Sequence, residues 1–186
     1  MEYVRKGRKE FPDDKNFIIE EYNYYVTRGQ LKEAIANLEL AIEKDPNNHI
    51  LVFSIGSIFD NIANPPKDKP QPKEEEYNKL VEQAETNYKK ALELKPDYFD
   101  AYYNLGALNF NTAVRMNDAA QEIKNNDAYN KQIKKADAKF AVALPYLEKA
   151  HELDSKDVTT INSLRLLYAR MGDFEKSNKM KALMIN

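Results

Sequence analysis

The stretch "ALELKPDYFDAYYNLGALNF", residues 91–110, has the pattern of one helix ending, a break at Pro96 and a second helix beginning. A second stretch, "AIEKDPNNHILVFSIGSIF" at residues 41–59, repeats that pattern. In both, an Ala precedes a Pro by five residues, and an apolar residue and a Gly follow that Pro by nine and ten. Proline cannot continue a helix, and the Asn47–Asn48 pair or Asp97 after it is suited to cap the next one. The chain therefore repeats a helix–turn–helix unit.

The spacing of these breaks indicates a regular period. The interval from Pro12 to Pro46 is about 34 residues, a size typical of repeat proteins. The intervals from Pro46 to Pro96, and from Pro96 to Ser155 in "HELDSKD", are both longer, which predicts insertions. We divide the chain into a tail of a preceding repeat (1–12) and four repeats: 13–46, 47–96 with an insert at about 62–78, 97–155 with an elongated helical hairpin at about 112–136, and a C-terminal cap (156–186).

Within each unit, apolar residues recur at the spacing of one helix face. The second helix of each of the first three units carries a small–large–small set: Ala34, Leu38 and Ala41; Ala84, Tyr88 and Ala91; Ala143, Leu147 and Ala150. Small residues let a neighbouring helix approach closely. A glycine inside a helix costs about 1 kcal/mol relative to alanine, so Gly56 and Gly106 predict tight helix contacts at the same place in two units.

The first and last units depart from this pattern. Tyr22 and Arg165 stand where Gly56 and Gly106 stand in the middle units, which predicts looser or rearranged packing there. In the last helix, polar and flexible side chains replace the alanine set, as expected for a terminal repeat whose outer face has no neighbour; they are Ser177, Lys181 and Met184. Two glycines mark the predicted turns between paired helices of these units: Gly29 and Gly172.

The insertions fall between the paired helices of the two middle units. Four prolines within residues 61–79 favour an extended loop, and the acidic run Glu74–Glu76 suits the first turn of a helix reaching Leu94. In the third unit we predict two long helices over about 98–123 and 127–153, turning at Asn125–Asn126. Because both insertions join a first helix to a second helix, we expect them to project from one edge of the array.

These residues resemble tetratricopeptide repeats, which are helix–turn–helix units of about 34 residues. Tyr102, Leu105 and Gly106 match the family's aromatic–Leu–Gly signature, and its second helix is matched by "AIANLELAIEKDP", "AETNYKKALELKP" and "ALPYLEKAHELDS". The resemblance implies an all-α, α–α superhelical solenoid. It also implies a non-enzymatic module that binds a protein or peptide partner on the concave face or along the insert edge of the solenoid, of a kind found in bacterial multi-repeat proteins.

In this family the first helix of each unit lines a concave groove that binds peptides. Asparagine can pair with a peptide backbone, and Phe53 and Tyr103 can anchor apolar side chains. The alternative is that the same residues are ordinary exposed helix positions. Carried over to this sequence, the resemblance implies these peptide-binding candidates: Ile19, Asn23, Phe53, Ser57, Asp100, Tyr103, Asn104, Asn162, Ser163 and Arg170.

Some members of the family bind a C-terminal carboxylate through Lys, Asn and Arg side chains on successive first helices. The positions that need a cation carry Asp100 or Thr159, and Asn104 or Ser163, depending on the alignment. An anionic peptide end would therefore meet an acidic or neutral side chain. We do not expect a carboxylate clamp in this chain.

The composition provides no motif for catalysis or for a cofactor. The chain has 28 Lys and Arg against 30 Asp and Glu, no Cys and two His. We interpret His49 and His151 as surface or hydrogen-bonded residues, and the basic runs "YVRKGRKEF" and "QIKKADAK" as solvated helix faces. The longest apolar run, near residues 50–59, is too short to span a bilayer. We therefore expect no enzyme, cofactor, metal, nucleic-acid partner or membrane insertion.

The N-terminal residues match the end of a repeat whose first helix is missing, because Val4 and Gly7 align with Leu38 and Ala41. This predicts a C-terminal fragment of a longer protein, with Met1 supplied for expression. Similar bacterial proteins are often exported, and a signal peptide would lie upstream, so the sequence leaves the compartment open. It also leaves the oligomeric state open, and the alternative function is a structural element that holds other domains or self-associates.

Overall fold

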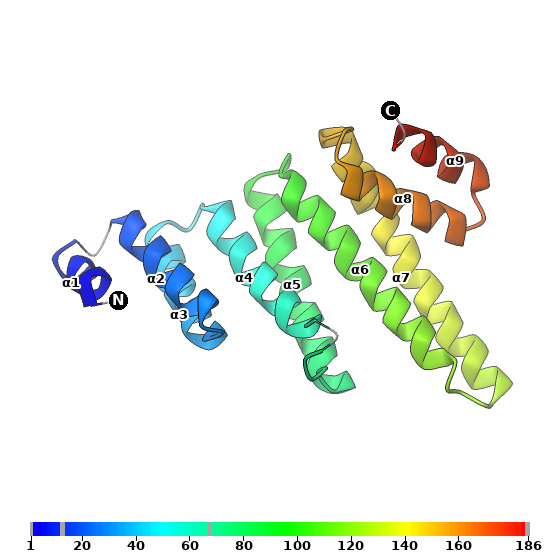
Figure 1. The fold of residues 1–186 in the computed structure, drawn as a ribbon, viewed down its shortest axis with the longest axis horizontal. Helices are drawn as coiled ribbons and strands as arrows, with labels where there is room; N and C mark the ends of the chain where they lie inside the picture. Colours follow the sequence, from blue (N-terminus) through cyan, green and yellow to red (C-terminus); the bar gives the residue numbers. More distant parts are fainter. Residues whose placement is uncertain (1, 12–13, 67, 185–186) are drawn as a thin grey trace. The chain divides into compact units, whose positions relative to one another are not determined.

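The computed structural model describes residues 2–11, 14–66 and 68–184 of the chain. In these ranges all regular secondary structure is helical (Figure 1). The helices divide between two compact units, Met1–Pro96 and Asp97–Asn186. Unit 1 holds α1 (Glu2–Glu10), α2 (Lys15–Thr27), α3 (Leu31–Lys44), α4 (His49–Ala63) and α5 (Glu74–Leu94), and unit 2 holds α6 (Phe99–Ala120), α7 (Asn126–Leu153), α8 (Val158–Arg170) and α9 (Phe174–Leu183).

Each unit is built from helix pairs that are consecutive in sequence. In unit 1, α2 packs on α3 and α4 on α5, while α1 packs on α2. In unit 2, α6 packs on α7 along most of its length and α8 packs on α9 (Figure 1). The predicted all-α class is confirmed. The repeat boundaries placed at residues 13, 47, 97 and 156 stay a prediction.

The small–large–small sets form the core of the second helices, as predicted. All nine side chains are buried, from Ala34 at 0% exposure to Leu38 and Ala41 at 2% and 3%. The two glycines lie at close helix contacts. A Cβ at Gly56 would lie 2.9 Å from Tyr88 Cδ1, and one at Gly106 would lie 2.5 Å from Leu147 Cγ. Neither position can accept a side chain unless Tyr88 or Leu147 on the partner helix moves.

The short turns between paired helices also lie where the sequence predicts them. Gly29 and Gly172 have φ angles of 67° and 79°, a region that glycine adopts at little cost. Asn48 caps α4 by accepting hydrogen bonds from the backbone N–H groups of Ile50 and Leu51. The predicted cap at Asp97 is wrong, because α6 begins at Phe99 and Tyr98 is its N-cap residue, without a side-chain hydrogen bond.

The second insertion takes the predicted form of a long helical hairpin. The first is not the extended loop predicted, because Lys69 N donates to the Pro66 carbonyl at 2.9 Å and closes a turn. Helix α5 begins at Glu74, after a connection in which Gln71 Nε2 donates to the carbonyls of Pro66 and Lys69 at 3.2 and 3.1 Å. The long hairpin of unit 2 consists of α6 and α7, with α6 ending three residues earlier than predicted. Asn125 caps α7 by accepting from Ala128 N at 2.9 Å. The expectation that both insertions project from one edge involves both units and stays a prediction.

The last helix pair shows how a polar residue replaces the alanine set. Ser177 is 8% exposed and its hydroxyl donates to the backbone carbonyl of Arg165 at 2.9 Å. This bond joins α9 to α8 at the position where the middle units have a glycine, so the packing is rearranged as expected. The outer side of α9 is exposed, with Phe174 at 68% and Leu183 at 47%.

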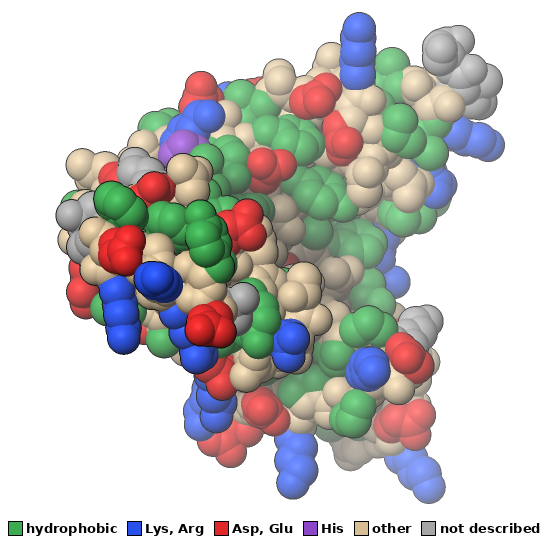
Figure 2. Space-filling model, turned by 60° about the vertical axis from the view of Figure 1, so that its left-hand side comes forward, with side chains coloured by type: hydrophobic (Ala, Val, Ile, Leu, Met, Phe, Trp, Pro, Cys, Tyr) green, Lys and Arg blue, Asp and Glu red, His purple; other side chains and the backbone are tan. Residues whose placement is uncertain are grey.

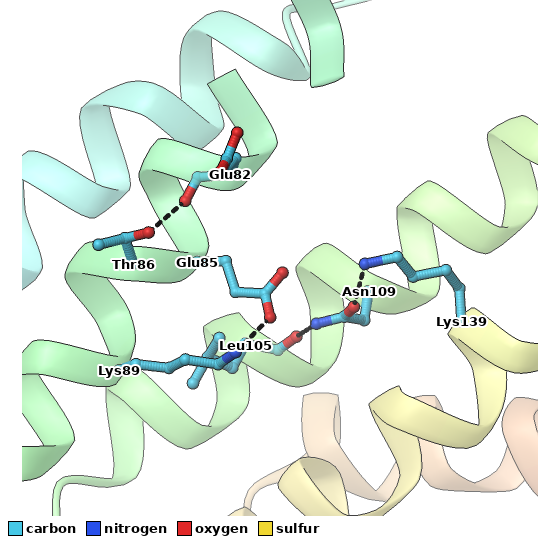
Figure 3. Close-up of polar contacts among 7 residues, drawn as sticks. All are labelled: Glu82, Glu85, Thr86, Lys89, Leu105, Asn109 and Lys139. Carbon is cyan, nitrogen blue, oxygen red and sulfur yellow. Dashed lines mark hydrogen bonds and ion pairs between the residues drawn. The ribbon is translucent and has the colours of Figure 1, made fainter. Parts of the chain in front are cut away.

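Figure 3 shows polar contacts within α5 and between the two helices of the unit 2 hairpin. On α5, the Thr86 hydroxyl donates to the Glu82 carbonyl at 2.8 Å and Lys89 pairs with Glu85 at 2.6 Å. In the unit 2 hairpin, the buried Asn109 donates to the Leu105 carbonyl and accepts from Lys139 Nζ at 3.1 Å. A buried amide is costly unless paired, so this contact favours one register of α6 against α7. Among the described helices, none combines the length and apolar character needed to cross a bilayer.

Candidate functional site

An apolar trough lies in unit 1 between the first helices α2 and α4, at the end where α3 turns into α4. It consists of two adjoining cavities of about 160 and 230 Å³, which share part of their lining. We call it the α2–α4 trough. Its lining comprises Ile18, Ile19 and Tyr22 from α2, Leu38, Ala41, Lys44 and Asp45 from α3 and its end, and Asn48, Ile50, Leu51 and Ser54 from the turn and α4.

The floor of the trough belongs to the core and its rim reaches solvent. Ile18, Leu38 and Ala41 are buried, whereas Ile19 and Ile50 are 48% and 54% exposed. Large aliphatic side chains left half in water lose the free energy that burial would provide, about 25 cal/mol per Å². The trough would therefore gain stability from an apolar group bound between these two side chains.

The polar groups of the trough are engaged in holding its walls. Asn48 donates from Nδ2 to Asp45 Oδ2 at 3.0 Å while its oxygen caps α4. The Tyr22 hydroxyl shares a hydrogen bond with Ser54, and burial raises the pKa of Tyr22. Small-molecule sites are usually about 300–1,000 Å³ with several convergent polar groups. The polar groups of the trough hold its own walls and much of its lining is apolar, so it is better matched to an apolar side chain than to a polar metabolite.

Comparisons with known proteins give the fold. A family model described as TPR repeat matches residues 81–112, which include the stretch that first revealed the pattern. The match with the solved structure of MamA covers 98% of this chain and 82% of the MamA chain, with 17% sequence identity and a TM-score of 0.62. The chain has the tetratricopeptide-repeat fold. TTC0263, a thermophilic TPR protein of Thermus thermophilus, is also similar, with 98% and 78% coverage, 17% identity and a TM-score of 0.57.

These comparisons concern the fold and do not identify a function. At 17% identity, the likeness to MamA and TTC0263 concerns the arrangement of helices alone. A sequence search of curated proteins finds no match. The predicted resemblance to tetratricopeptide repeats is nevertheless confirmed. Proteins with these repeats are in general non-enzymatic scaffolds for protein–protein interaction.

Of the site residues predicted in unit 1, one lies at the trough. Ile19 forms part of its rim, and Asn23 is exposed one helical turn farther along α2. Phe53 instead packs on the Tyr88 ring of α5, with the ring centroids 5.3 Å apart. Ser57 also contacts Tyr88, through a side-chain hydrogen bond. Phe53 and Ser57 therefore support the α4–α5 pair rather than the trough.

The structure brings two of the predicted residues of unit 2 into contact. Tyr103 on α6 shares a hydrogen bond with Ser163 on α8 and stacks on Phe99 with centroids 6.3 Å apart. Asn104 donates to the backbone carbonyl of Asp100 at 2.7 Å, within its own helix. The Asp100 side chain hydrogen-bonds Tyr98; burial together with this carboxylate raises the pKa of Tyr98 to about 12.

The two remaining candidates in unit 2 are engaged in separate contacts. Asn162 accepts from the guanidinium of Arg165 at 2.9 Å, within α8. Arg170 donates to Asn117 Oδ1 at 2.7 Å and lies over the Phe140 ring, 4.6 Å from its centroid. None of these contacts tests peptide binding, and the ten residues remain candidates.

The sequence prediction missed most of the trough lining. One signal was present: Ile50 is apolar at a position where the other units carry Asn16, Asp100 and Thr159. An apolar residue at a position that is polar in the other repeats indicates a surface that differs between repeats. Elsewhere in the described ranges, no group of three or more His, Cys, Asp or Glu side chains is arranged to hold a metal ion.

Proposed function

We propose that this chain is a non-enzymatic protein-interaction module that binds a segment of a partner protein at the α2–α4 trough. The observation that carries this proposal is the open, apolar trough, with Ile19 and Ile50 half exposed at its rim. Tetratricopeptide-repeat proteins in general mediate protein–protein interactions, which supports the broader part of the proposal.

The bound segment places one apolar side chain in the trough and extends along α2. Asn23 follows Ile19 by four residues, so both lie on one face of α2. An exposed amide at this position is able to pair with the backbone of an extended peptide. In unit 2, Tyr103 and Asn104 already hold internal hydrogen bonds. We propose the candidates of that unit as secondary contacts only.

The test is a peptide-display selection on the wild-type protein, followed by titration of a selected peptide against variants. In Ile19→Asp and Ile50→Asp, a carboxylate replaces an aliphatic wall of the trough. Each is expected to weaken binding by about tenfold or more, since one fully buried aliphatic side chain contributes about 1.5–3 kcal/mol. NMR chemical-shift changes caused by the peptide are expected in residues 18–23 and 48–54.

The matched control is Val158→Asp, which introduces the same charge at an aliphatic residue of unit 2 that is 59% exposed. Its affinity is expected to stay within about twofold of wild type. Selected peptides that bind all three variants equally, or that shift residues elsewhere, would remove the trough from the proposal.

A second candidate function is assembly through self-association. It is favoured by the exposed apolar side chains of α9, Phe174 and Leu183. Sedimentation velocity over a wide concentration range distinguishes the two candidates. A monomer at all concentrations would exclude self-association, and Phe174→Ser is expected to abolish any dimer that forms through α9.

A further inference from the structure

Helix α1 carries a stripe of positive charge on one face. Glu2, Arg5, Lys6 and Lys9 follow the i, i+3, i+4, i+7 spacing and line an open depression of unit 1. The helix sequence EYVRKGRKE contains four basic and two acidic residues, whereas the whole chain has a net charge of −2. This helix therefore has a surplus of positive charge, although the chain as a whole is slightly acidic.

The side of α1 away from the two lysines is anchored to unit 1 by a polar network. Arg8 pairs with Glu21 of α2 at 3.2 Å, and Glu21 also accepts from Asn37 Nδ2 of α3 at 2.8 Å. Arg5, at the edge of the stripe, hydrogen-bonds the Tyr25 hydroxyl. These contacts orient α1 so that Lys6 and Lys9 reach solvent.

The two lysines of the stripe have no acidic partner within the described ranges. Lys6 and Lys9 form no ion pair there, whereas Lys79 and Lys89 of α5 pair with Glu75 and Glu85 at 2.8 and 2.6 Å. A neighbouring carboxylate would stabilise an exposed lysine only modestly. Two such lysines beside Arg5 on one helix face nevertheless attract an anionic partner and direct its approach.

An aromatic hollow of about 220 Å³ adjoins the stripe, and Lys6 borders both. Tyr3 and Phe11 stand at its rim with exposures of 79% and 59%, and the Phe17 ring forms its floor. Gly7 allows this arrangement, because a Cβ at that position would clash with the Phe17 ring. Figure 2 brings this end of unit 1 forward and shows exposed hydrophobic side chains among charged ones.

The stripe is not a packing surface of the repeat. The alignment of α1 with α3 places Glu2, Arg5, Lys6 and Lys9 at the positions of four exposed α3 residues. Those residues are Ala36, Glu39, Leu40 and Glu43. The same outward face is thus acidic on α3 and basic on α1, as expected for a surface that selects its partner by charge.

We propose that α1 binds an acidic segment of a partner protein. Carboxylates of the segment lie along Arg5, Lys6 and Lys9, and one apolar side chain enters the aromatic hollow beside Tyr3. Charge complementarity identifies the partner chemistry, and the hollow distinguishes a protein segment from a purely anionic polymer. The proposal uses a surface other than the α2–α4 trough and does not depend on it.

The test uses a fluorescein-labelled peptide of about ten Asp and Glu residues with one central Phe, titrated by fluorescence anisotropy at low salt. Lys6→Gln/Lys9→Gln is expected to weaken binding about two- to thirtyfold, because two exposed ion pairs are lost. Replacing the peptide's Phe by Ala is expected to weaken binding to wild type. Raising the salt concentration to about 0.5 M is expected to weaken it further, by screening.

The matched control is Lys32→Gln/Lys90→Gln, which removes two exposed lysines from other helices of unit 1 and is expected to bind within about twofold of wild type. Ile19→Asp is also expected to retain binding, which separates this site from the trough. Circular dichroism of each variant checks that α1 stays folded.

The proposal would be overturned if both double variants lost binding affinity equally. It would also be overturned if the acidic peptide and its Asn/Gln counterpart bound with the same affinity. Tighter binding to phosphatidylserine vesicles or to a single-stranded oligothymidylate would overturn it as well, in favour of a membrane or a nucleic acid.

Discussion

The space between the first helices of neighbouring repeats is open in unit 1, between α2 and α4, and filled in unit 2, between α6 and α8. Ile19 of α2 and Tyr103 of α6 each follow the helix-breaking proline by seven residues, so they occupy equivalent positions. In unit 1 the space beside Ile19 is the open α2–α4 trough. In unit 2, Tyr103 stacks on Phe99, packs on the core cluster that contains Phe140 and bonds Ser163 of α8.

The residues at these equivalent positions differ in how far they reach toward the next helix. A tyrosine provides a large ring and a hydroxyl that reaches the next helix, whereas an isoleucine ends short of it. In unit 1 the bond to the next first helix comes instead from Tyr22, whose hydroxyl pairs with Ser54. The two units hold their first helices with the same kind of bond, but the space beside the equivalent residue is open in unit 1 and filled in unit 2.

The largest expected effect comes from the central leucines of the two cores. Leu147 is fully buried against Gly106, whereas Leu38 lines the trough. We expect Leu147→Ala to lower the free energy of unfolding by about 4 kcal/mol and Leu38→Ala by about 2 kcal/mol, because the space left at Leu38 merges with an existing opening. Urea unfolding measures both, and hydrogen exchange assigns each loss to its unit. A larger loss for Leu38→Ala would contradict the comparison.

An exchange of the two equivalent side chains has the next largest effect. Tyr103→Ile removes the bond to Ser163 and the stacking on Phe99, and is expected to lower the free energy of unfolding by about 1–2 kcal/mol. Ile19→Tyr is expected to leave stability within about 0.5 kcal/mol and to abolish binding of peptides selected for the trough. Tyr103→Phe, which keeps the ring, separates the two contributions. Undiminished peptide binding by Ile19→Tyr would show that the trough is not the site.

Helix periodicity was sufficient to predict most of the fold. The alanine sets and the glycines at helix contacts act within one repeat or between adjacent ones, so their spacing in the sequence reports their packing. The polar candidates were less predictable, because their partners are not marked by any period. Asn104 donates to its own helix, and Arg170 reaches Asn117 on the unit 2 hairpin.

The α2–α4 trough was also beyond the sequence prediction, which named Ile19 of its lining but not Ile50. An opening results from side chains that fail to meet, and the choice of isoleucine at residue 19 instead of tyrosine does not alter the apolar pattern. Sequence patterns report which residues are buried, but not how far each side chain reaches toward the next helix.

The smallest expected effect concerns a second contrast between the units. Asp60 of α4 is equivalent to Phe110 of α6, which packs on Phe140. Asp60 accepts from the Tyr88 hydroxyl at 3.2 Å and from Asn64 Nδ2 at 2.8 Å. Burial outweighs these bonds and raises the pKa of its carboxyl. The folded state thus binds this proton more tightly than the unfolded chain, whose Asp pKa is about 3.9.

The stabilising contribution of that proton is complete below the unfolded pKa and is lost as the pH rises through the folded one. Asp60→Asn removes the ionisation and keeps an oxygen that accepts from Tyr88. We therefore expect the variant to gain stability relative to wild type between about pH 3 and pH 7, by less than about 1 kcal/mol. Urea unfolding at several pH values measures this difference, with the exposed Asp97→Asn as control. A gain that appears only toward low pH would mean that Tyr88 and Asn64 stabilise the carboxylate more than burial destabilises it.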